Sequence, residues 1–356
     1  MSRVLMTADA VGGVWTYALE LARGLASAGL STTIATMGPE DLKPDAGDVT
    51  GLEIVSSDFA LERMDDSWRD LERAGQWLLD LEARVNPIII HLNGFAHGTL
   101  PWRAPFVMVG HSCMLSWADA VGETLDPQRQ DRYRATVRAG LRAADWLVAP
   151  SGAMLAQLRH HYGPLPRASA IWNGRTAATF LPLHKEPLIL TGGPLWDRAK
   201  NIEAIAAIAP LLDWPVAALG EGSAGPAVHH LGRLAERDVA GWLGRASIFA
   251  LPARYEPFGL LPLEAALAGC ALVVGDIPSL REIWCDAADY VDCDDRTALK
   301  RAIEALIDDS RRRTARAEAA RARALELTPA RMTCEYITAY GCAAGRTDGR
   351  RSSCVS

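Results

Sequence analysis

Two glutamates lie eight positions apart in the stretch RYEPFGLLPLEAALAG, which spans residues 254–269. The stretch is otherwise largely apolar, and a carboxylate in apolar surroundings needs a partner. Pro257 disfavours helical backbone at Glu256, and Pro262 suits the first turn of a helix, so Glu256 is predicted on a loop and Glu264 early in a helix that begins at Pro262. A carboxylate can accept hydrogen bonds from two neighbouring hydroxyls, as on a sugar or a ribose. We interpret the pair as a polyol-binding site rather than as a solvated loop charge beside a helix-dipole contact.

Backbone groups add donors to these carboxylates. Gly259 lets the chain bend, and the N–H groups of Phe258, Gly259 and Leu260 are predicted to be available to a phosphate or a hydroxyl. Near the N-terminus, Gly12 and Gly13 come directly before a predicted helix, where free N–H groups and the helix dipole favour an anion. Neither GxGxxG nor GxxxxGK[ST] occurs there, so this second signal is weak by itself.

Two cations and two histidines complete the set of candidate residues. Arg198 and Lys200, in PLWDRAKN (194–201), can neutralise a phosphate, and cations are mildly unfavourable at the start of a helix, which supports a ligand there. His91 and His111 lie near the ends of consecutive predicted strands. Either imidazole could donate a hydrogen bond or titrate near neutrality, and two on adjacent loops favour a functional over a purely structural interpretation.

The candidate residues follow strands in a chain that alternates between strand and helix patterns. Strands are predicted over 3–9, 31–37, 87–93, 105–111, 146–150, 187–193, 215–222, 247–252 and 271–276. Helices are predicted over 14–29, 65–85, 127–143, 201–212 and 239–246, and from Pro262. This alternation predicts an α/β protein with two doubly wound parallel sheets, whose ligands bind beyond the carboxyl ends of the strands.

The domain boundaries are predicted from an irregular, proline-rich linker at 173–187. The first domain spans residues 1–174 and the second spans 175–328. A late helix at about 329–343 is predicted to pack back on the first domain, and residues 344–356 are predicted to form a disordered tail.

Composition excludes several classes of protein. The net charge of −6 argues against a general nucleic-acid binder, and seven cysteines without a CxxC pair argue against a disulfide framework or a zinc site. No apolar run approaches the ~18 residues of a membrane span, and the N-terminal sequence lacks the pattern of a signal peptide, so a cytoplasmic protein is predicted. Arg134, Arg138 and Arg142 share one helix face; a solvated face is the first interpretation, and peripheral contact with an anionic membrane or an acceptor phosphate is the alternative.

At this point the residues resemble a known family. The segment EPFGLLPLE matches the E-x7-E signature of retaining glycosyltransferases of the GT-B fold, and the chain outside its tail resembles glycosyltransferase family 4, also described as glycosyl transferases group 1. The supporting segments, in order, are GGVWTYALELARGLASAG, HSC, NGR, LWDRAKN and LPARYEPFGLLPLEAALAGCALVVGDIPSLREIW. The resemblance implies two Rossmann-like domains facing a central cleft, with an acceptor-binding first domain and a donor-binding second domain.

The resemblance also implies roles for the candidate residues. Glu264 would hold the ribose hydroxyls of a nucleotide sugar, and Glu256 would hold the transferred sugar together with the backbone of residues 258–260. His111 would contact that sugar from the first domain. Three residues are predicted to be catalytic: His111, Glu256 and Lys200.

The diphosphate of the donor would meet Lys200, with Gly12 and Gly13 lining its approach. One position departs from the family: relatives carry GRL where this chain has GPL, so Pro194 replaces a phosphate-binding arginine. Arg198, four residues later, is predicted to substitute for it.

The implied reaction is sugar transfer with retained anomeric configuration, without a metal ion or other cofactor. The donor would be a UDP- or GDP-linked sugar, and the acceptor a glycan, a lipid-linked sugar or a small molecule. The glutamates would position substrate, and the leaving phosphate would take the proton of the acceptor. The alternatives are a sugar-nucleotide epimerase of similar fold and, because of Pro194, a donor-binding pseudoenzyme.

Overall fold

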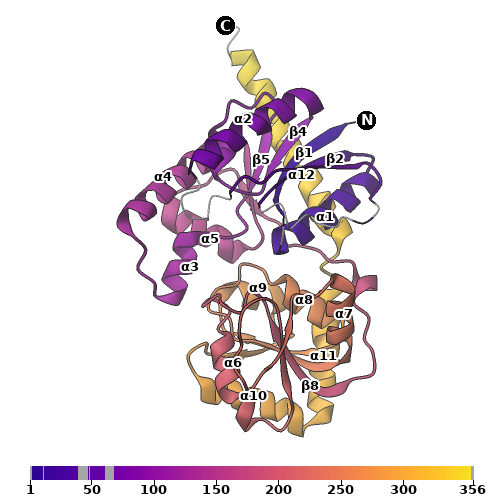
Figure 1. The fold of residues 1–356 in the computed structure, drawn as a ribbon. Coiled ribbons are helices and arrows are strands. Elements are labelled where there is room, and N and C mark those ends of the chain that lie inside the picture. The colour runs from indigo at the N-terminus through magenta and orange to yellow at the C-terminus, as the bar shows by residue number, and fades with distance from the viewer. Residues whose placement is uncertain (1, 11, 39–46, 48, 61–67, 354–356) are drawn as a thin grey trace. The chain divides into compact units, whose positions relative to one another are not determined.

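The computed structural model describes residues 2–10, 12–38, 47, 49–60 and 68–353. The chain forms two compact units (Figure 1). The first comprises Met1–Ser116, Thr124–Gly174 and Pro329–Ser356, and the second comprises Trp117–Glu123 and Arg175–Thr328. The joins at 174/175 and 328/329 are the positions at which the sequence analysis divides the chain, whereas the assignment of Trp117–Glu123 to the second unit was not anticipated.

The first unit is built on a seven-stranded parallel sheet with the order β3-β2-β1-β4-β5-β6-β7. Its strands are β1 Arg3–Asp9, β2 Ser31–Met37, β3 Leu52–Ser56, β4 Ile89–Leu92, β5 Phe106–Val109, β6 Trp146–Ala149 and β7 Ala168–Ala170. Its helices are α1 Gly13–Ser27, α2 Trp68–Val85, α3 Met114–Val121, α4 Pro127–Ala143, α5 Gly152–Tyr162 and α12 Pro329–Ser353, of which α3 extends into the segment assigned to the second unit. The central strands are buried on both faces, which explains their continuous apolar runs.

Local sequence signals explain where these helices begin. The Asp126 carboxylate accepts a hydrogen bond from the Arg129 N–H at the start of α4, with Pro127 as the first helical residue. The Ser151 hydroxyl caps α5 in the same way by accepting from the Met154 N–H. Both helices therefore begin at a polar cap that satisfies an otherwise unpaired backbone donor.

Helix α12 packs against α1 and the sheet within the first unit (Figure 1). Met332, Tyr336 and Ala343 of α12 belong to the same buried core as residues of α1, β1 and β4. The helix ends at Ser353 rather than at 343, so it includes residues 344–353, which are ten residues of the stretch predicted to be a disordered tail. The glycines at 345 and 349 lower helix propensity without ending the helix, and residues 354–356 lie outside the described residues.

The second unit contains a six-stranded parallel sheet with the order β10-β9-β8-β11-β12-β13. Its strands are β8 Glu186–Gly192, β9 Val216–Leu219, β10 His229–Gly232, β11 Ala246–Leu251, β12 Ala271–Gly275 and β13 Asp289–Val291. Its helices are α6 Ile202–Ile208, α7 Glu236–Arg245, α8 Leu260–Leu267, α9 Pro278–Trp284, α10 Arg296–Asp308 and α11 Ser310–Ala324. Strand order reverses between β8 and β11, which makes their carboxyl ends the topological switch point where ligands of such sheets bind.

Two helices of this unit differ from their predicted limits. Helix α8 begins at Leu260 instead of Pro262, so Glu264 is its fifth residue and lies in the second turn. The left-handed backbone of Gly259 already starts the helix there. Helix α6 ends at Ile208 and continues only as a 3-10 turn over Ala209–Leu211, because Pro210 cannot donate the next helical hydrogen bond.

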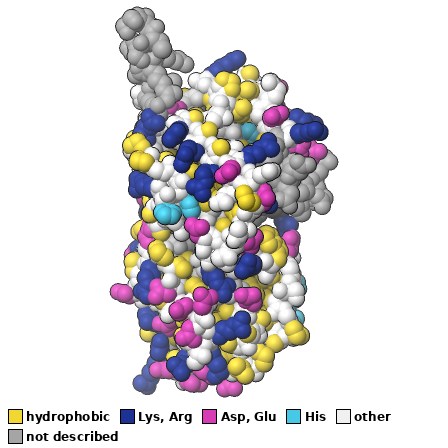
Figure 2. All heavy atoms as spheres, turned by 90° about the vertical axis from the view of Figure 1, so that its left-hand side faces the viewer, with side chains coloured by type: hydrophobic (Ala, Val, Ile, Leu, Met, Phe, Trp, Pro, Cys, Tyr) yellow, Lys and Arg dark blue, Asp and Glu magenta, His cyan; other side chains and the backbone are white. Residues whose placement is uncertain are grey.

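The molecular face on the α4 side shows basic side chains gathered over the first unit, whereas basic and acidic side chains are mixed over the second (Figure 2). Arg138 and Arg142 of α4 are exposed and Arg134 is half-buried, and these three form no ion pair with any residue that the structure describes. Contact of this face with an anionic membrane stays a prediction. Within the described part of the chain, no helix combines the length and apolar character needed to cross a bilayer.

Candidate functional site

The predicted sugar carboxylate and the predicted phosphate cation form an ion pair. Lys200 lies in the loop after β8 and Glu256 in the loop after β11, and Lys200 Nζ donates to Glu256 Oε2 at 2.7 Å. Their side chains are only 16% and 14% exposed. The aliphatic part of Lys200 passes close to Gly193, whose φ of +131° also excludes most side chains. A ligand at this position would meet a preassembled pair with one positive and one negative group.

The second glutamate of the motif is held by an arginine for which no role was predicted. Arg175 Nε donates to Glu264 Oε1 at 2.8 Å, and Arg175 Nη2 donates to Glu236 Oε1 at 2.6 Å. Its guanidinium is 3% exposed and lies 4.9 Å from the ring centre of Phe180. Arg175 stands in the NGR segment noted above, but nothing in the sequence linked it to a residue 89 positions away.

The backbone between the two glutamates adopts the predicted bend. Gly259 has φ +94° and forms the N-cap of α8, a conformation that glycine adopts without steric cost. Among the described residues, the N–H groups of Phe258, Gly259 and Leu260 donate no hydrogen bond. The Ser279 hydroxyl donates to the Glu256 carbonyl at 2.5 Å and so anchors the start of this loop. The first turn of α8 therefore offers unused donors beside Glu256.

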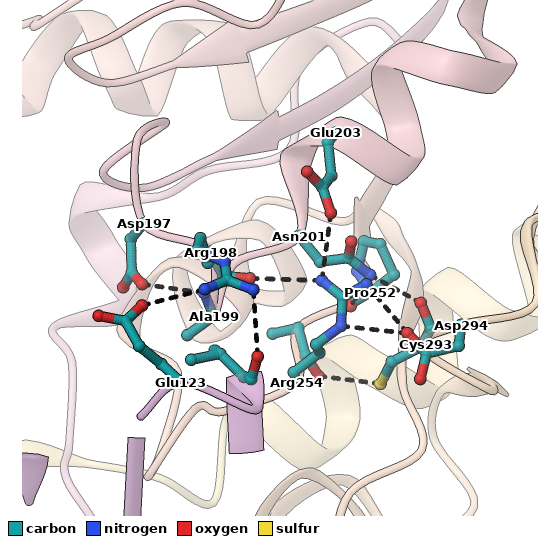
Figure 3. Close-up of polar contacts among 12 residues, drawn as sticks. Glu123, Asp197, Arg198, Ala199, Asn201, Glu203, Pro252, Arg254, Cys293 and Asp294 are labelled. Atoms are coloured by element: carbon teal, nitrogen blue, oxygen red, sulfur yellow. Dashed lines mark hydrogen bonds and ion pairs between the residues drawn. The ribbon is translucent and has the colours of Figure 1, made fainter. Parts of the chain in front are cut away.

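The loop that carries Lys200 is fixed to two neighbouring loops (Figure 3). Asn201, buried and left-handed at φ +55°, donates from Nδ2 to the carbonyls of Pro252 and Cys293 at 3.0 and 2.7 Å. Arg254 donates through its backbone N–H to the Ala199 carbonyl at 2.8 Å. These bonds connect the loop after β8 with the segments that follow β11 and β13. Asn201 was not among the residues predicted from the sequence, although it stands next to Lys200.

Arg198 contacts the segment 117–123. Its side chain is 58% exposed, and Nη1 donates to Glu123 Oε2 at 3.0 Å while Nη2 donates to the Val121 carbonyl at 3.2 Å (Figure 3). The neighbouring Asp197 accepts from Trp117 Nε1 at 2.8 Å. The structure thus engages Arg198 with the segment 117–123, and its substitution for the arginine absent at Pro194 stays a prediction.

Gly12, Gly13 and His111 belong to the first unit, whereas the carboxylates and cations described above belong to the second unit. Gly12 has φ +84° and is the N-cap of α1, and among the described residues beyond its chain neighbours no atom lies within 4 Å of the position that a Cβ would occupy. Gly13 is the first residue of α1. The open space above Gly12 and the exposed start of α1 are compatible with an approaching anion.

His111 is part of a polar cluster that also contains His91. Nε2 of His111 lies 2.8 Å from Asn93 Oδ1, and Nε2 of His91 lies 3.1 Å from the same oxygen. His91 Nδ1 lies 2.7 Å from the hydroxyl of Tyr340 in α12, and its Nε2 lies 3.1 Å from that of Tyr17 in α1. Burial lowers the pKa of both imidazoles to about 3, so each is neutral at physiological pH.

The two glutamates of the motif are not arranged as metal ligands. Each of the two motif carboxylates is already paired with a cation, Glu256 with Lys200 and Glu264 with Arg175. A divalent cation needs carboxylates whose charge is directed at it rather than at a lysine or arginine. Metal independence stays a prediction, as does the binding of hydroxyls and phosphates by these groups.

Two family descriptions match consecutive parts of the chain. "Glycosyltransferase Family 4" matches residues 11–177, and "Glycosyl transferases group 1" matches residues 221–323, which contain both glutamates of the motif. The chain belongs to these glycosyltransferase families, and its two parallel-sheet α/β units have the GT-B fold.

Curated relatives match part of the chain. Glycogen synthase from Mycobacterium tuberculosis is 29% identical over 209 residues, which cover 51% of this chain and 50% of that protein. Phosphatidyl-myo-inositol mannosyltransferase from Propionibacterium freudenreichii is 30% identical over 131 residues, which cover 35% and 32%. The chain therefore spans half or less of the length of these curated relatives.

Solved structures match nearly the whole chain. Sucrose-phosphate synthase from Thermosynechococcus elongatus has a TM-score of 0.84 at 17% identity and covers 100% of both chains. Anabaena HepE, solved in complex with UDP and glucose, has a TM-score of 0.71 at 14% identity and covers 95% of this chain and 99% of its own. At these identities the likeness establishes the fold alone.

Proposed function

We propose that the protein transfers a sugar from a nucleotide-sugar donor to an acceptor hydroxyl, and that the second unit binds the donor. The observation that carries the proposal is the arrangement at the switch point of the six-stranded sheet. There, Glu256 is paired with Lys200, and Glu264 is held by Arg175. Unused N–H groups at the start of α8 lie between these two glutamates in the chain. Carboxylates, a cation and free backbone donors are the groups that bind hydroxyls and phosphate.

UDP-linked sugars are the first donors to test, and GDP-linked sugars the second. The support is that Anabaena HepE, a protein of the same fold, was solved with UDP and with UDP-glucose. In this proposal Glu264 binds the ribose hydroxyls, and Glu256 binds hydroxyls of the transferred sugar. Arg175 keeps the Glu264 carboxylate in place while that carboxylate, which has about four acceptor positions, also receives hydroxyls.

The reaction breaks the bond between the sugar carbon and the diphosphate oxygen and forms a bond from that carbon to the acceptor oxygen. Negative charge builds on the leaving diphosphate, and Lys200 and the N-terminus of α8 stabilise it, which is usually the largest catalytic contribution in such reactions. The acceptor hydroxyl attacks from the side of the leaving group, and its proton passes to the phosphate oxygen. The anomeric configuration is thereby retained, without a metal ion.

Lys200 is tested best against Lys300, because both lysines pair with a glutamate and Lys300 lies in α10, away from the loops of the site. Lys200→Met is expected to lower kcat/KM for sugar transfer about 100-fold, the usual cost of losing a group that stabilises transition-state charge. Lys300→Met should leave turnover unchanged. Thermal unfolding of each variant checks that the loss does not come from unfolding.

Glu264 is tested by calorimetry with a panel of nucleotide sugars and by a product assay with and without acceptor. Glu264→Gln should weaken donor binding about tenfold or more, because an amide is a poorer acceptor for ribose hydroxyls than a carboxylate. Unchanged affinity and turnover in Glu264→Gln would exclude the proposed donor site. Interconversion of nucleotide sugars without acceptor would indicate an epimerase, and binding without any product would indicate a pseudoenzyme.

A further inference from the structure

Asn93 lies between His91 and His111 and follows β4 directly. Its backbone N–H donates to the Thr7 hydroxyl at 2.9 Å, and its Nδ2 lies 2.7 Å from the Thr7 carbonyl. Thr7 belongs to β1, the neighbour of β4 in the sheet. Asn93 is therefore held at both its backbone and its side chain by one residue of the adjacent strand.

This contact fixes which way the Asn93 amide points. A backbone carbonyl can only accept a hydrogen bond, so the amide atom that faces Thr7 must be the nitrogen. The amide oxygen then faces Nε2 of His91 and Nε2 of His111 at 3.1 and 2.8 Å. Because an amide oxygen carries no hydrogen, both imidazoles must donate to it from Nε2.

The tautomers of the two histidines follow from this orientation. A neutral imidazole that carries its hydrogen on Nε2 has a lone pair on Nδ1. In His91 that lone pair accepts from the Tyr340 hydroxyl at 2.7 Å. In His111 no described residue makes a hydrogen bond to Nδ1, and the ring is held edge to face by Tyr17 with centroids 4.6 Å apart.

We propose that Asn93 is a positioning residue that fixes the Nε2–H tautomer of His111, so that His111 presents the Nδ1 lone pair to substrate and accepts a hydrogen bond from a sugar hydroxyl. The proposal rests on the proposed function, because it assumes that His111 contacts the transferred sugar. A lone pair at Nδ1 repels phosphate oxygens and attracts hydroxyls. His111 therefore selects a hydroxyl-bearing group, and in this state it has no proton at Nδ1 to give to a leaving group.

The tautomer is measured directly by nitrogen NMR of the full chain labelled with 15N-histidine. His111→Gln assigns the His111 signals by their disappearance. We expect a protonated Nε2 and an unprotonated Nδ1 for His111 at neutral pH in the wild-type protein. A protonated Nδ1 would overturn the proposal; the protonation state is read on the wild-type protein, and His111→Gln serves only to assign the signals.

Two variants test the role of Asn93. Asn93→Ala removes the acceptor, so His111 should show a mixture of tautomers, with kcat/KM lowered about 5- to 100-fold, the range expected when a polar group loses its buried partner. Asn93→Asp keeps an acceptor oxygen for Nε2–H and should keep the His111 signals of the Nε2–H form. An unchanged His111 tautomer in Asn93→Ala would contradict the proposal, because a residue that acts only on packing would give that result.

Substrate analogues test the acceptor role of His111. Each hydroxyl of the accepted donor sugar is replaced in turn by fluorine, which cannot donate a hydrogen bond. One analogue should be disfavoured by wild type at least tenfold more than by His111→Ala; equal discrimination in both proteins for every analogue would refute the contact. The tautomer signals report on His111, and Glu264→Gln reports on donor binding independently of His111. A failure of the His111 contact is therefore distinguished from a failure of the proposed function.

Discussion

Removal of the Arg175 side chain should destabilise the second unit strongly. Arg175 is 3% exposed and Glu264 is 10% exposed at the side chain, so Arg175→Met would leave a buried carboxylate without its cation. Breaking a buried ion pair in this way costs about 3–5 kcal/mol. The second contact adds little: Glu236 is 52% exposed, and pairs with an exposed partner contribute at most about 1 kcal/mol. We therefore expect a loss of about 3–5 kcal/mol from the free energy of unfolding.

The measurement must report on the second unit by itself, because the chain has two units and its unfolding need not be a single transition. Hydrogen exchange followed by mass spectrometry gives this resolution, since peptides from β11 and α8 report on that unit alone. In urea, those peptides should lose protection at a lower concentration in Arg175→Met than in wild type.

A matched control is Arg233→Met, which removes an arginine paired with Glu221 at side-chain exposures of 49% and 63%. Its cost should stay below about 1 kcal/mol. The double variant Arg175→Met/Glu264→Gln should recover much of the loss, because no uncompensated charge remains buried. A loss below 1 kcal/mol in Arg175→Met, or additive losses in the double variant, would refute the reasoning.

Three further predictions concern stability. Burial holds the folded pKa of His91 at about 3 against an ordinary 6.5, so up to about 5 kcal/mol of the free energy of unfolding is present above pH 6.5 and is lost as the pH falls from 6.5 to about 3. Urea unfolding across this range should depend less on pH in His91→Phe than in wild type, and equal pH dependence would contradict this prediction. Asn201→Ala removes both side-chain hydrogen bonds and leaves an alanine at φ +55°, so it should lower the free energy of unfolding in urea by about 2–3 kcal/mol. A loss near zero would refute this prediction. A Cβ at Gly140 would lie 2.3 Å from the Phe95 carbonyl oxygen, so Gly140→Ala should lower the free energy of unfolding by at least about 1–3 kcal/mol. Gly241→Ala, in an open helical position, should raise it by about 0.5–1 kcal/mol, and similar melting temperatures for the two variants would argue against the packing described.

The α/β architecture is legible in the sequence because it depends on local patterns. The long apolar strands and the amphipathic helices have the expected periodicities, and α4 begins and ends at the predicted residues. The strands that the sequence analysis missed are short: β3, β7, β10 and β13 have three to five residues. Such segments carry too few alternating positions to show a period, and they become strands only because a neighbouring edge is available for pairing.

The candidate site divides in the same way. The E-x7-E motif and Lys200 are adjacent to their strands in the sequence, so their place at the carboxyl edge of a sheet could be inferred. The partners of the candidate residues could not, because they come from distant segments: Arg175 is 89 positions from Glu264, and Tyr340 is 249 positions from His91. Distant pairings depend on tertiary packing, which a single sequence does not display.

The return of α12 to the first unit has a consequence for how the chain is made. Ribosomes release the polypeptide from its N-terminus, and five residues of α12, from Met332 to Ala343, are needed to complete a core that otherwise consists of residues up to Ile171. The second unit, apart from its short segment at 117–123, is continuous from Arg175 to Thr328 and has all its strands before α12 emerges. The half that is synthesised first thus finishes its assembly last, and until then the apolar surface that α12 covers is exposed and prone to aggregation.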